Sequence, residues 1–233
     1  MENRKQVNRD MIIRVARILE PLLDRIVFVG GVVAGLIITD EGAPDVRPTV
    51  DVDIVADVSS KAEFWKLEGF LRELGLTQSS EDKVICRWRI EDMTVDFIPT
   101  DSSVLGFSNP WYKDAFNASI EIELEEGIAV RMITAPYFLA TKIAAFEGRG
   151  KLDFLASHDM EDIITVIDGR SEIVDEIRDS DEKLKRFLSK VFQTYLEKPE
   201  FMESLPGKLP GDVASQARLP ILVDRLRQIG SLS

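Results

Sequence analysis

The sequence contains one cysteine and one histidine among its 233 residues. A single cysteine, Cys86, excludes an intrachain disulfide, and this fits a reducing compartment such as the cytoplasm. The lone His158 has aspartates near it but lacks the second histidine or cysteine that a zinc site would use. We therefore expect neither a disulfide-stabilised scaffold nor a zinc centre, and we interpret Cys86 as a small core residue.

Long apolar runs are also missing from the sequence. No stretch approaches the ~20 apolar residues of a membrane-spanning helix. The basic residues near the start are not followed by an apolar segment with a cleavage site, so a signal peptide is not expected. Because 45% of the residues are hydrophobic, the chain can form one sizeable core. We expect a cytoplasmic protein with no membrane segment.

Positive charge is scarce. The chain has 29 Lys and Arg residues against 41 Asp and Glu residues, and its formal net charge is −12 at pH 7. Broad nonspecific binding to nucleic acid depends on basic residues that neutralise phosphates, and this composition argues against it. A nucleotide in a local site, an RNA end on a small basic patch, and a basic partner protein all remain compatible.

The most informative segment runs from residue 26 to residue 55. An apolar run at residues 26–29 stops at Gly30 and Gly31, and a second apolar segment follows at residues 32–38. After a polar loop comes the sequence TVDVDIV, residues 49–55. This order predicts a strand, a glycine turn, a short helix, a loop and a second strand. Because residues two apart on a strand share a face, Asp51 and Asp53 are expected side by side.

Two neighbouring carboxylates repel each other, and a divalent cation relieves that repulsion. Mg²⁺ is bound in proteins by a few carboxylates together with waters and substrate phosphates. Glycines allow the backbone to approach a ligand closely, and the start of a helix offers free N–H groups to an anion. The segment therefore predicts a Mg²⁺ site at Asp51 and Asp53 and a phosphate site at Gly30 and Gly31. The alternatives are a solvated strand edge and a purely structural turn.

Gly30-Gly31 followed by Asp51-Val-Asp53 resembles the signature of the nucleotidyltransferase superfamily with the DNA polymerase β-like fold. The family places a third carboxylate on a later strand, and this chain offers Asp96 in the segment 93–98. Residues 142–170 resemble the bacterial nucleotidyltransferases of the AbiEii/AbiGii toxin type. The spacer between Gly31 and Asp51 is longer than is usual in the family. A polar insert at residues 40–46 accounts for the excess, and it must fold clear of the motif.

The resemblance implies a Mg²⁺-dependent enzyme that transfers NMP from an NTP to a hydroxyl acceptor. Asp51, Asp53 and Asp96 would then be the catalytic metal ligands, and Asp96 would also help to deprotonate the acceptor. RNA, a protein and a small molecule all remain open as acceptors, and toxin-type relatives are neutralised by antitoxin proteins. The alternative is a non-catalytic protein of the same fold that binds a nucleotide or a partner. Convergence of the three carboxylates would favour catalysis.

The resemblance also implies nucleotide contacts outside the acidic strand. In related enzymes a lysine on the helix after the core sheet binds the triphosphate, and Lys142 occupies that place. Asp153 would orient Lys142 or contact the nucleotide, and Thr49 lies close enough in sequence to touch a phosphate. The alternatives are a snorkelling surface lysine for Lys142 and a capping or surface role for Thr49. The weaker candidates for phosphate contacts are Arg47, Arg149 and Lys151.

The alternation of strand and helix patterns predicts an α+β fold with an α/β-like core. We expect a small mixed sheet in residues 1–135, which form the nucleotidyltransferase core, and a helical C-terminal part packed on it in residues 136–233. Pro21 should end or bend the first helix, and Ser60 with Glu63 fits a capping box. Two antiparallel hairpins are predicted, one of residues 83–90 with 93–98 and one of residues 120–124 with 128–133. Later helices are predicted to begin at residues 135 and 157. Residues 101–117 are predicted to be a loop, and residues 198–211 a linker.

Overall fold

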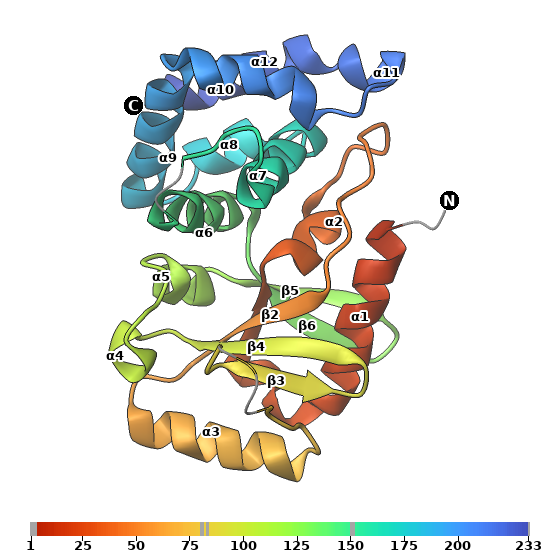
Figure 1. The fold of residues 1–233 in the computed structure, drawn as a ribbon, viewed down its shortest axis with the longest axis vertical. Helices are drawn as coiled ribbons and strands as arrows, with labels where there is room; N and C mark the ends of the chain where they lie inside the picture. The colour runs from red at the N-terminus through yellow and green to blue at the C-terminus, as the bar shows by residue number, and fades with distance from the viewer. Residues whose placement is uncertain (1–3, 80–81, 83, 150–151, 233) are drawn as a thin grey trace. The chain divides into compact units, whose positions relative to one another are not determined.

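The computed structural model describes residues 4–79, 82, 84–149 and 152–232 (Figure 1). The chain divides into two compact units. The first consists of Met1–Gly35 and Arg47–Thr134, and the second of Leu36–Val46 and Ala135–Ser233. The first unit contains a mixed β-sheet and the second is helical, so the predicted α+β fold class is confirmed.

Within the described residues, the sheet of the first unit has six strands in the order β3-β4-β2-β1-β6-β5. The central strand β2 runs antiparallel to β1 and parallel to β4. Strand β1 is parallel to β6, and the two predicted hairpins are both antiparallel. The strands are β1 (Ile26–Val29), β2 (Asp51–Ala56), β3 (Arg87–Ile90), β4 (Met93–Pro99), β5 (Ile120–Glu125) and β6 (Ile128–Met132).

One face of the central strands is fully apolar. Val52 of β2, Val95 of β4 and Trp88 of β3 lie side by side in register, and none of the three is exposed. Helix α1 (Arg4–Ile18) packs against β5 and β6. It is followed by the 3-10 helix η1 (Glu20–Arg25), in whose first turn Pro21 lies. The predicted break at Pro21 is confirmed, because proline suits a first helical turn but not a helix interior.

Helix α3 (Lys61–Glu73) begins as its sequence predicts, since the Ser60 hydroxyl accepts a hydrogen bond from the N–H of Glu63. The Glu63 carboxylate accepts from the N–H and hydroxyl of Ser59, the residue before the cap.

Two parts of the first unit differ from the sequence predictions. Residues 101–117 contain the short helices α4 (Ser102–Leu105) and α5 (Tyr112–Asn117) instead of only a loop. Asp101 caps α4, and the buried Trp111 and Phe116 anchor the α5 region. Strand β3 begins at Arg87 instead of at Lys83, which lies outside the described residues.

The second unit is built from helices that pack around α6 and α9. Ser157 caps α7 as predicted, because its hydroxyl accepts from the N–H of Met160. Gly169 is the last residue of α7 and not its cap, and a Cβ there would lie 2.9 Å from Ile38. The helices are α6 (Ala135–Gly148), α7 (His158–Gly169), α8 (Ile173–Arg178), α9 (Glu182–Leu196), α10 (Pro199–Ser204), η3 (Leu205–Lys208), α11 (Val213–Gln216) and α12 (Leu219–Gly230).

The predicted linker at residues 198–211 is wrong. This stretch forms α10 and η3, and Phe201 and Leu205 are almost completely buried. The ring of Phe201 packs against Phe154 and Tyr195, with ring centres 5.3 and 5.5 Å away. Pro199 stands in the first turn of α10, where a missing N–H costs nothing.

The polar insert predicted at residues 40–46 belongs to the second unit. The N–H groups of Thr39 and Asp40 both donate to the carbonyl of Gly169. The Asp40 carboxylate accepts from Arg218 at 2.6 Å, and Arg218 also bonds Asp168. Hydrogen bonding to Arg218 lowers the pKa of Asp40. The insert is thus fixed by contacts within the second unit, whereas the Gly-Gly turn and the aspartate pair belong to the first.

Among the described residues, no helix combines the length and the apolar character needed to cross a membrane.

Candidate metal centre

The acidic triad, Asp51, Asp53 and Asp96, is built by strand register. Strands β2 and β4 run parallel, and Asp53 lies directly opposite Asp96. Asp51 precedes Asp53 by two residues on the same strand and therefore shares its face. The intervening Val52 points to the other face, where it is fully buried. A hydrophobic core on one side of β2 thus fixes the direction of the carboxylates on the other side.

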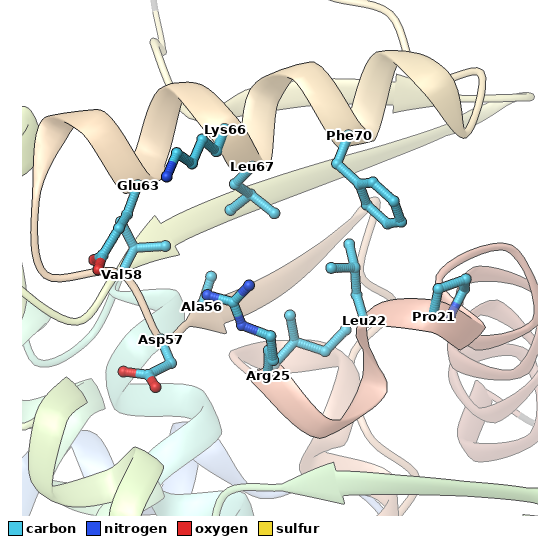
Figure 2. A pocket seen from close by; sticks show the side chains of 11 residues that line it. Pro21, Leu22, Arg25, Ala56, Asp57, Val58, Glu63, Lys66, Leu67 and Phe70 are labelled. Carbon is cyan, nitrogen blue, oxygen red and sulfur yellow. The ribbon is translucent and has the colours of Figure 1, made fainter.

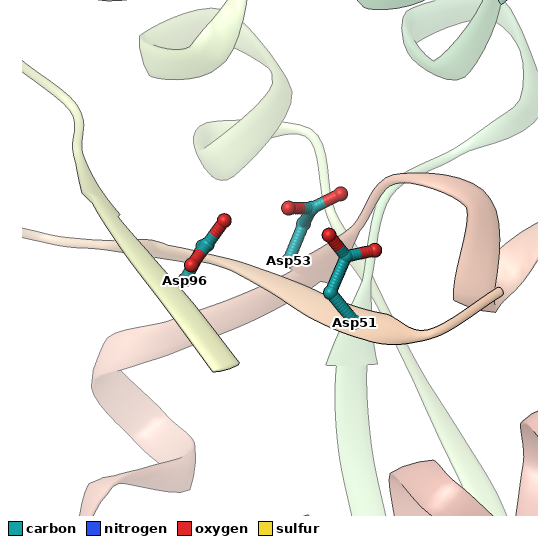
Figure 3. A group of neighbouring side chains, drawn as sticks. All are labelled: Asp51, Asp53 and Asp96. Carbon is teal, nitrogen blue, oxygen red and sulfur yellow. The ribbon is translucent and has the colours of Figure 1, made fainter. Parts of the chain in front are cut away.

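The three carboxylates converge (Figure 3). Each offers an oxygen, and these oxygens all lie within 4.8 Å of one another. Asp51 and Asp53 are half-buried, and Asp96 is 7% exposed. Carboxylate oxygens from a few side chains, with room for water and phosphate, are the ligands that Mg²⁺ prefers. The three carboxylates therefore fit a divalent cation, which is the ligand that the sequence pattern predicts.

Sequence reasoning missed Arg87, which lies beside the triad. Its Nε donates to Asp96 at 2.9 Å and its Nη2 donates to the second Asp96 oxygen at 2.7 Å. Nη2 also reaches Asp51 at 3.4 Å. The hydrogen bonds to Asp96 are the main cause that raises the pKa of Arg87. A signal was present, because pairing back from the Glu91-Asp92 turn places Arg87 opposite Asp96.

Gly30 has a structural reason to be glycine. Its φ of +72° lies in the left-handed region, and a Cβ there would lie only 2.0 Å from an oxygen of Asp53. The turn therefore passes directly over the Asp53 carboxylate, which no other residue type would permit. Gly31 is buried and begins the 3-10 helix η2 (Gly31–Val33), which continues into α2 (Ala34–Ile37). The Thr49 hydroxyl contacts the carbonyl and carboxylate oxygens of Asp51 at 3.2 and 3.3 Å.

A second group of charges, the α6–α7 ion cluster, lies in the helical unit. It consists of Lys142, Arg149, Asp159 and Asp162. The ammonium of Lys142 lies 2.6 Å from Asp162 and 3.4 Å from Asp159, and Arg149 also contacts Asp159. The carboxylate side chains are only 5% and 3% exposed. The cluster therefore ties α6 to α7.

Asp153 makes different contacts from those of the ion cluster. One of its carboxylate oxygens accepts from the N–H groups of Leu155 and Ala156, which shapes the turn before α7. The carboxylates on Lys142 are Asp159 and Asp162. The nucleotide contacts at Lys142 and Asp153 stay predictions, and Lys151 lies outside the described residues.

Comparison with solved structures gives a likeness of shape alone. No family model matches the chain, and no curated protein matches it. The fold is similar to the crystal structure of an antigenic nucleotidyltransferase-like protein from Paracoccidioides brasiliensis. The two chains are 18% identical, the match covers 86% of this chain and 92% of the other, and the TM-score is 0.48. At this identity and score, the likeness carries no functional inference.

Cys86 directly precedes Arg87, the first residue of β3, and is buried. It is 2% exposed, and burial is the main cause that raises the pKa of its thiol to about 12. A thiol with such a pKa is almost wholly protonated at neutral pH, so it is a poor nucleophile. Cys86 therefore acts as a core residue.

A pocket of about 320 Å³ lies at the opposite end of β2 from Asp51 (Figure 2). Residues of η1 and α3 form most of its lining, including the apolar Leu22, Leu67 and Phe70 and the charged Arg25. Ala56, the last residue of β2, also belongs to the lining. At about 3.3 Å per residue, this end of the strand is roughly 16 Å from Asp51. The pocket and the acidic triad are therefore separate sites.

Proposed function

We propose that the protein is a Mg²⁺-dependent nucleotidyltransferase that transfers NMP from an NTP to a hydroxyl acceptor. The observation that supports this most is the convergence of Asp51, Asp53 and Asp96 on one face of β2 and β4. Such phosphoryl transfer needs mainly positioning and charge neutralisation, and a cluster of carboxylates that holds a cation supplies both.

In the reaction, an oxygen of the acceptor attacks the α-phosphorus of the NTP. The new P–O bond forms as the bond to the bridging oxygen breaks, and pyrophosphate leaves. A divalent cation, when bound, would neutralise phosphate charge and help to orient the reacting oxygens. On the protein side, Asp51 and Asp53 would hold it from β2. Asp96 would complete the site from β4 and take up the proton of the acceptor hydroxyl.

The nucleotide is proposed to lie near the turn at Gly30 and Gly31, whose glycines permit close approach of the backbone. Thr49 contacts Asp51 in the free protein and would position that carboxylate. Lys142 and Asp153 are proposed nucleotide contacts on the basis of family resemblance. A phosphate at Lys142 would have to compete with two buried carboxylates, Asp159 and Asp162.

The resemblance of residues 142–170 to toxin-type enzymes supports a more specific proposal, in which the protein is the toxin of a toxin–antitoxin pair. RNA, a protein or a small molecule would accept the nucleotide. A second candidate function, non-catalytic binding of a nucleotide or a partner, is favoured by the pairing of Asp96 with Arg87, since this pair already satisfies a carboxylate of the triad.

A label-transfer assay tests the proposal. The purified full chain is incubated with each of four α-labelled NTPs, Mg²⁺, total RNA and cell extract. We expect label on a macromolecule or small acceptor, and its loss in the double variant Asp51→Ala/Asp53→Ala. The matched control is Glu121→Ala/Glu123→Ala, which removes two carboxylates with the same spacing from β5, an edge strand of the same sheet.

Two outcomes would contradict the proposal. Label transfer that survives in the Asp51→Ala/Asp53→Ala variant would show that another site performs the chemistry. If the wild-type protein shows neither transfer nor Mg²⁺-dependent nucleotide binding, the metal centre has no catalytic role and the non-catalytic function gains.

A further inference from the structure

Arg87 occupies a position that a cation would be expected to take in a group of three carboxylates. It reaches both oxygens of Asp96 and one oxygen of Asp51. A planar guanidinium that bonds both oxygens of a carboxylate makes a directional, two-point contact. The backbone pairing of β3 with β4 holds Arg87 opposite Asp96. The contact is therefore set by the sheet and does not depend on a flexible loop.

Arg87 also changes the charge that an incoming metal ion meets. The triad has a formal charge of −3, and Arg87 brings the group to −2. The guanidinium shares the carboxylate oxygens of Asp96 with any ion that binds there. Its side chain is only 28% exposed, so solvent screens this charge less than that of a fully exposed arginine.

We propose that Arg87 is a built-in counter-ion of the metal centre. It holds Asp96 and Asp51 together in the free protein and weakens the binding of a lone divalent cation. A cation that arrives with the phosphates of a nucleotide brings further oxygen ligands and overcomes this competition. The proposal rests on the proposed function, because it takes the acidic triad as the metal site.

Arg89 provides a matched control. It lies two residues further along β3 on the same face, opposite Thr94 instead of opposite an aspartate. Its guanidinium contacts Asp82 at 3.1 Å. The variants Arg87→Gln and Arg89→Gln therefore remove the same charge from the same strand, but only the first removes it from the triad.

The experiment is a titration of the full chain with Mn²⁺ in the absence of nucleotide, in which electron paramagnetic resonance measures the free ion. We expect Arg87→Gln to bind Mn²⁺ roughly tenfold more tightly than the wild type, because a nearby positive charge has been removed. Arg89→Gln should stay within about twofold of the wild type, because its charge is more distant and more screened.

A second measurement covers the case in which Arg87→Gln folds poorly. Arg87→Lys keeps the charge but loses the two-point contact, and its Mn²⁺ affinity should lie between those of the wild type and Arg87→Gln.

Thermal melting gives an independent readout. Without metal, Arg87→Gln should melt at a lower temperature than the wild type, and Mn²⁺ should raise its melting temperature by more.

Unchanged or weaker Mn²⁺ binding in both Arg87→Gln and Arg87→Lys would overturn the proposal. An increase in the Mn²⁺ affinity of Arg89→Gln equal to that of Arg87→Gln would also overturn it.

Failure of the proposed function gives a different pattern of results. Tighter Mn²⁺ binding by Arg87→Gln, with neither label transfer nor Mg²⁺-dependent nucleotide binding in the wild type, would contradict the function and support the counter-ion. Label transfer that depends on Asp51 and Asp53, with no change in Mn²⁺ affinity, would contradict the counter-ion alone. Absence of Mn²⁺ binding in all variants would contradict both.

Discussion

The acidic triad and the α6–α7 ion cluster use the same side-chain types to different ends. The triad brings three carboxylates together, two of which contact Arg87, and the four groups keep a formal charge of −2. The α6–α7 ion cluster pairs Asp159 and Asp162 with Lys142 and Arg149, so these four charges balance. Its carboxylates are almost fully buried, whereas Asp51 and Asp53 are half-buried.

This difference in charge balance distinguishes a group of side chains suited to binding an ion from one that stabilises the packing of helices. Carboxylates that lie together with too few cations repel one another, and an external cation relieves the strain. Buried charges that already have partners gain nothing from an added ion, and loss of one partner leaves the others buried and uncompensated. The triad is therefore suited to a ligand, and the α6–α7 ion cluster is suited to holding two helices together.

The largest effect is expected from Asp53→Asn in the triad. Loss of a metal ligand should lower the rate of label transfer by about a thousandfold, because cation contacts supply several kcal/mol of transition-state stabilisation. Without metal, the free energy of unfolding should stay the same or rise by up to about 1 kcal/mol, because a repulsive charge is removed. Single-turnover kinetics and urea denaturation measure the two quantities. A marked loss of stability without metal would contradict this account of the triad.

Asp162→Asn should do the reverse in the α6–α7 ion cluster. Loss of the carboxylate 2.6 Å from Lys142 leaves a buried ammonium with the more distant Asp159, and should lower the free energy of unfolding by about 3 kcal/mol. Mn²⁺ affinity should not change. Glu161→Gln is the control, because it removes an exposed charge from the preceding residue of the same helix and should cost less than about 0.5 kcal/mol. Equal effects of the two variants in urea denaturation would remove the contrast between the clusters.

Gly30→Ala tests whether the glycine turn sets the position of Asp53. The new Cβ would collide with the Asp53 carboxylate and displace it, and a misplaced ligand of this kind costs about a hundredfold in rate. Gly75→Ala is the control for backbone strain, since Gly75 has a φ of +89° with nothing within 4 Å of its added Cβ. Gly75→Ala should lose about 1–2 kcal/mol of stability from backbone strain, and Gly30→Ala should lose more because of the added collision. Only Gly30→Ala should lose transfer activity and Mn²⁺ affinity, and equal activities would disprove the role of the turn.

The sequence predicts the convergence of the three aspartates, because much of the geometry that brings them together is local. Alternation on β2 places Asp51 beside Asp53, and the hairpin of β3 and β4 brings Asp96 to the same sheet. Arg87 was missed, although the two-residue turn between β3 and β4 implies the register that sets it opposite Asp96. The partners of Lys142 could not be derived, because Asp159 and Asp162 meet it through the packing of α6 on α7.

The errors in secondary structure have a common cause. Residues 101–117 and 198–211 contain proline and glycine, which indicate a loop when they are counted by composition. Pro199 and Pro206 instead stand in the first turns of helices, where proline is well tolerated. Burial of Phe201 and Leu205 then outweighs local preference, and no local pattern reveals that burial.

The insert that precedes the acidic strand has a consequence for synthesis of the chain. Asp40 leaves the ribosome 178 residues ahead of its partner Arg218. At 5–20 residues per second, the insert waits about 10–35 s for that partner. Strand β2 begins only a few residues after the insert. A nascent chain can therefore complete the sheet that carries the three aspartates before the loop leading into it has its final anchor.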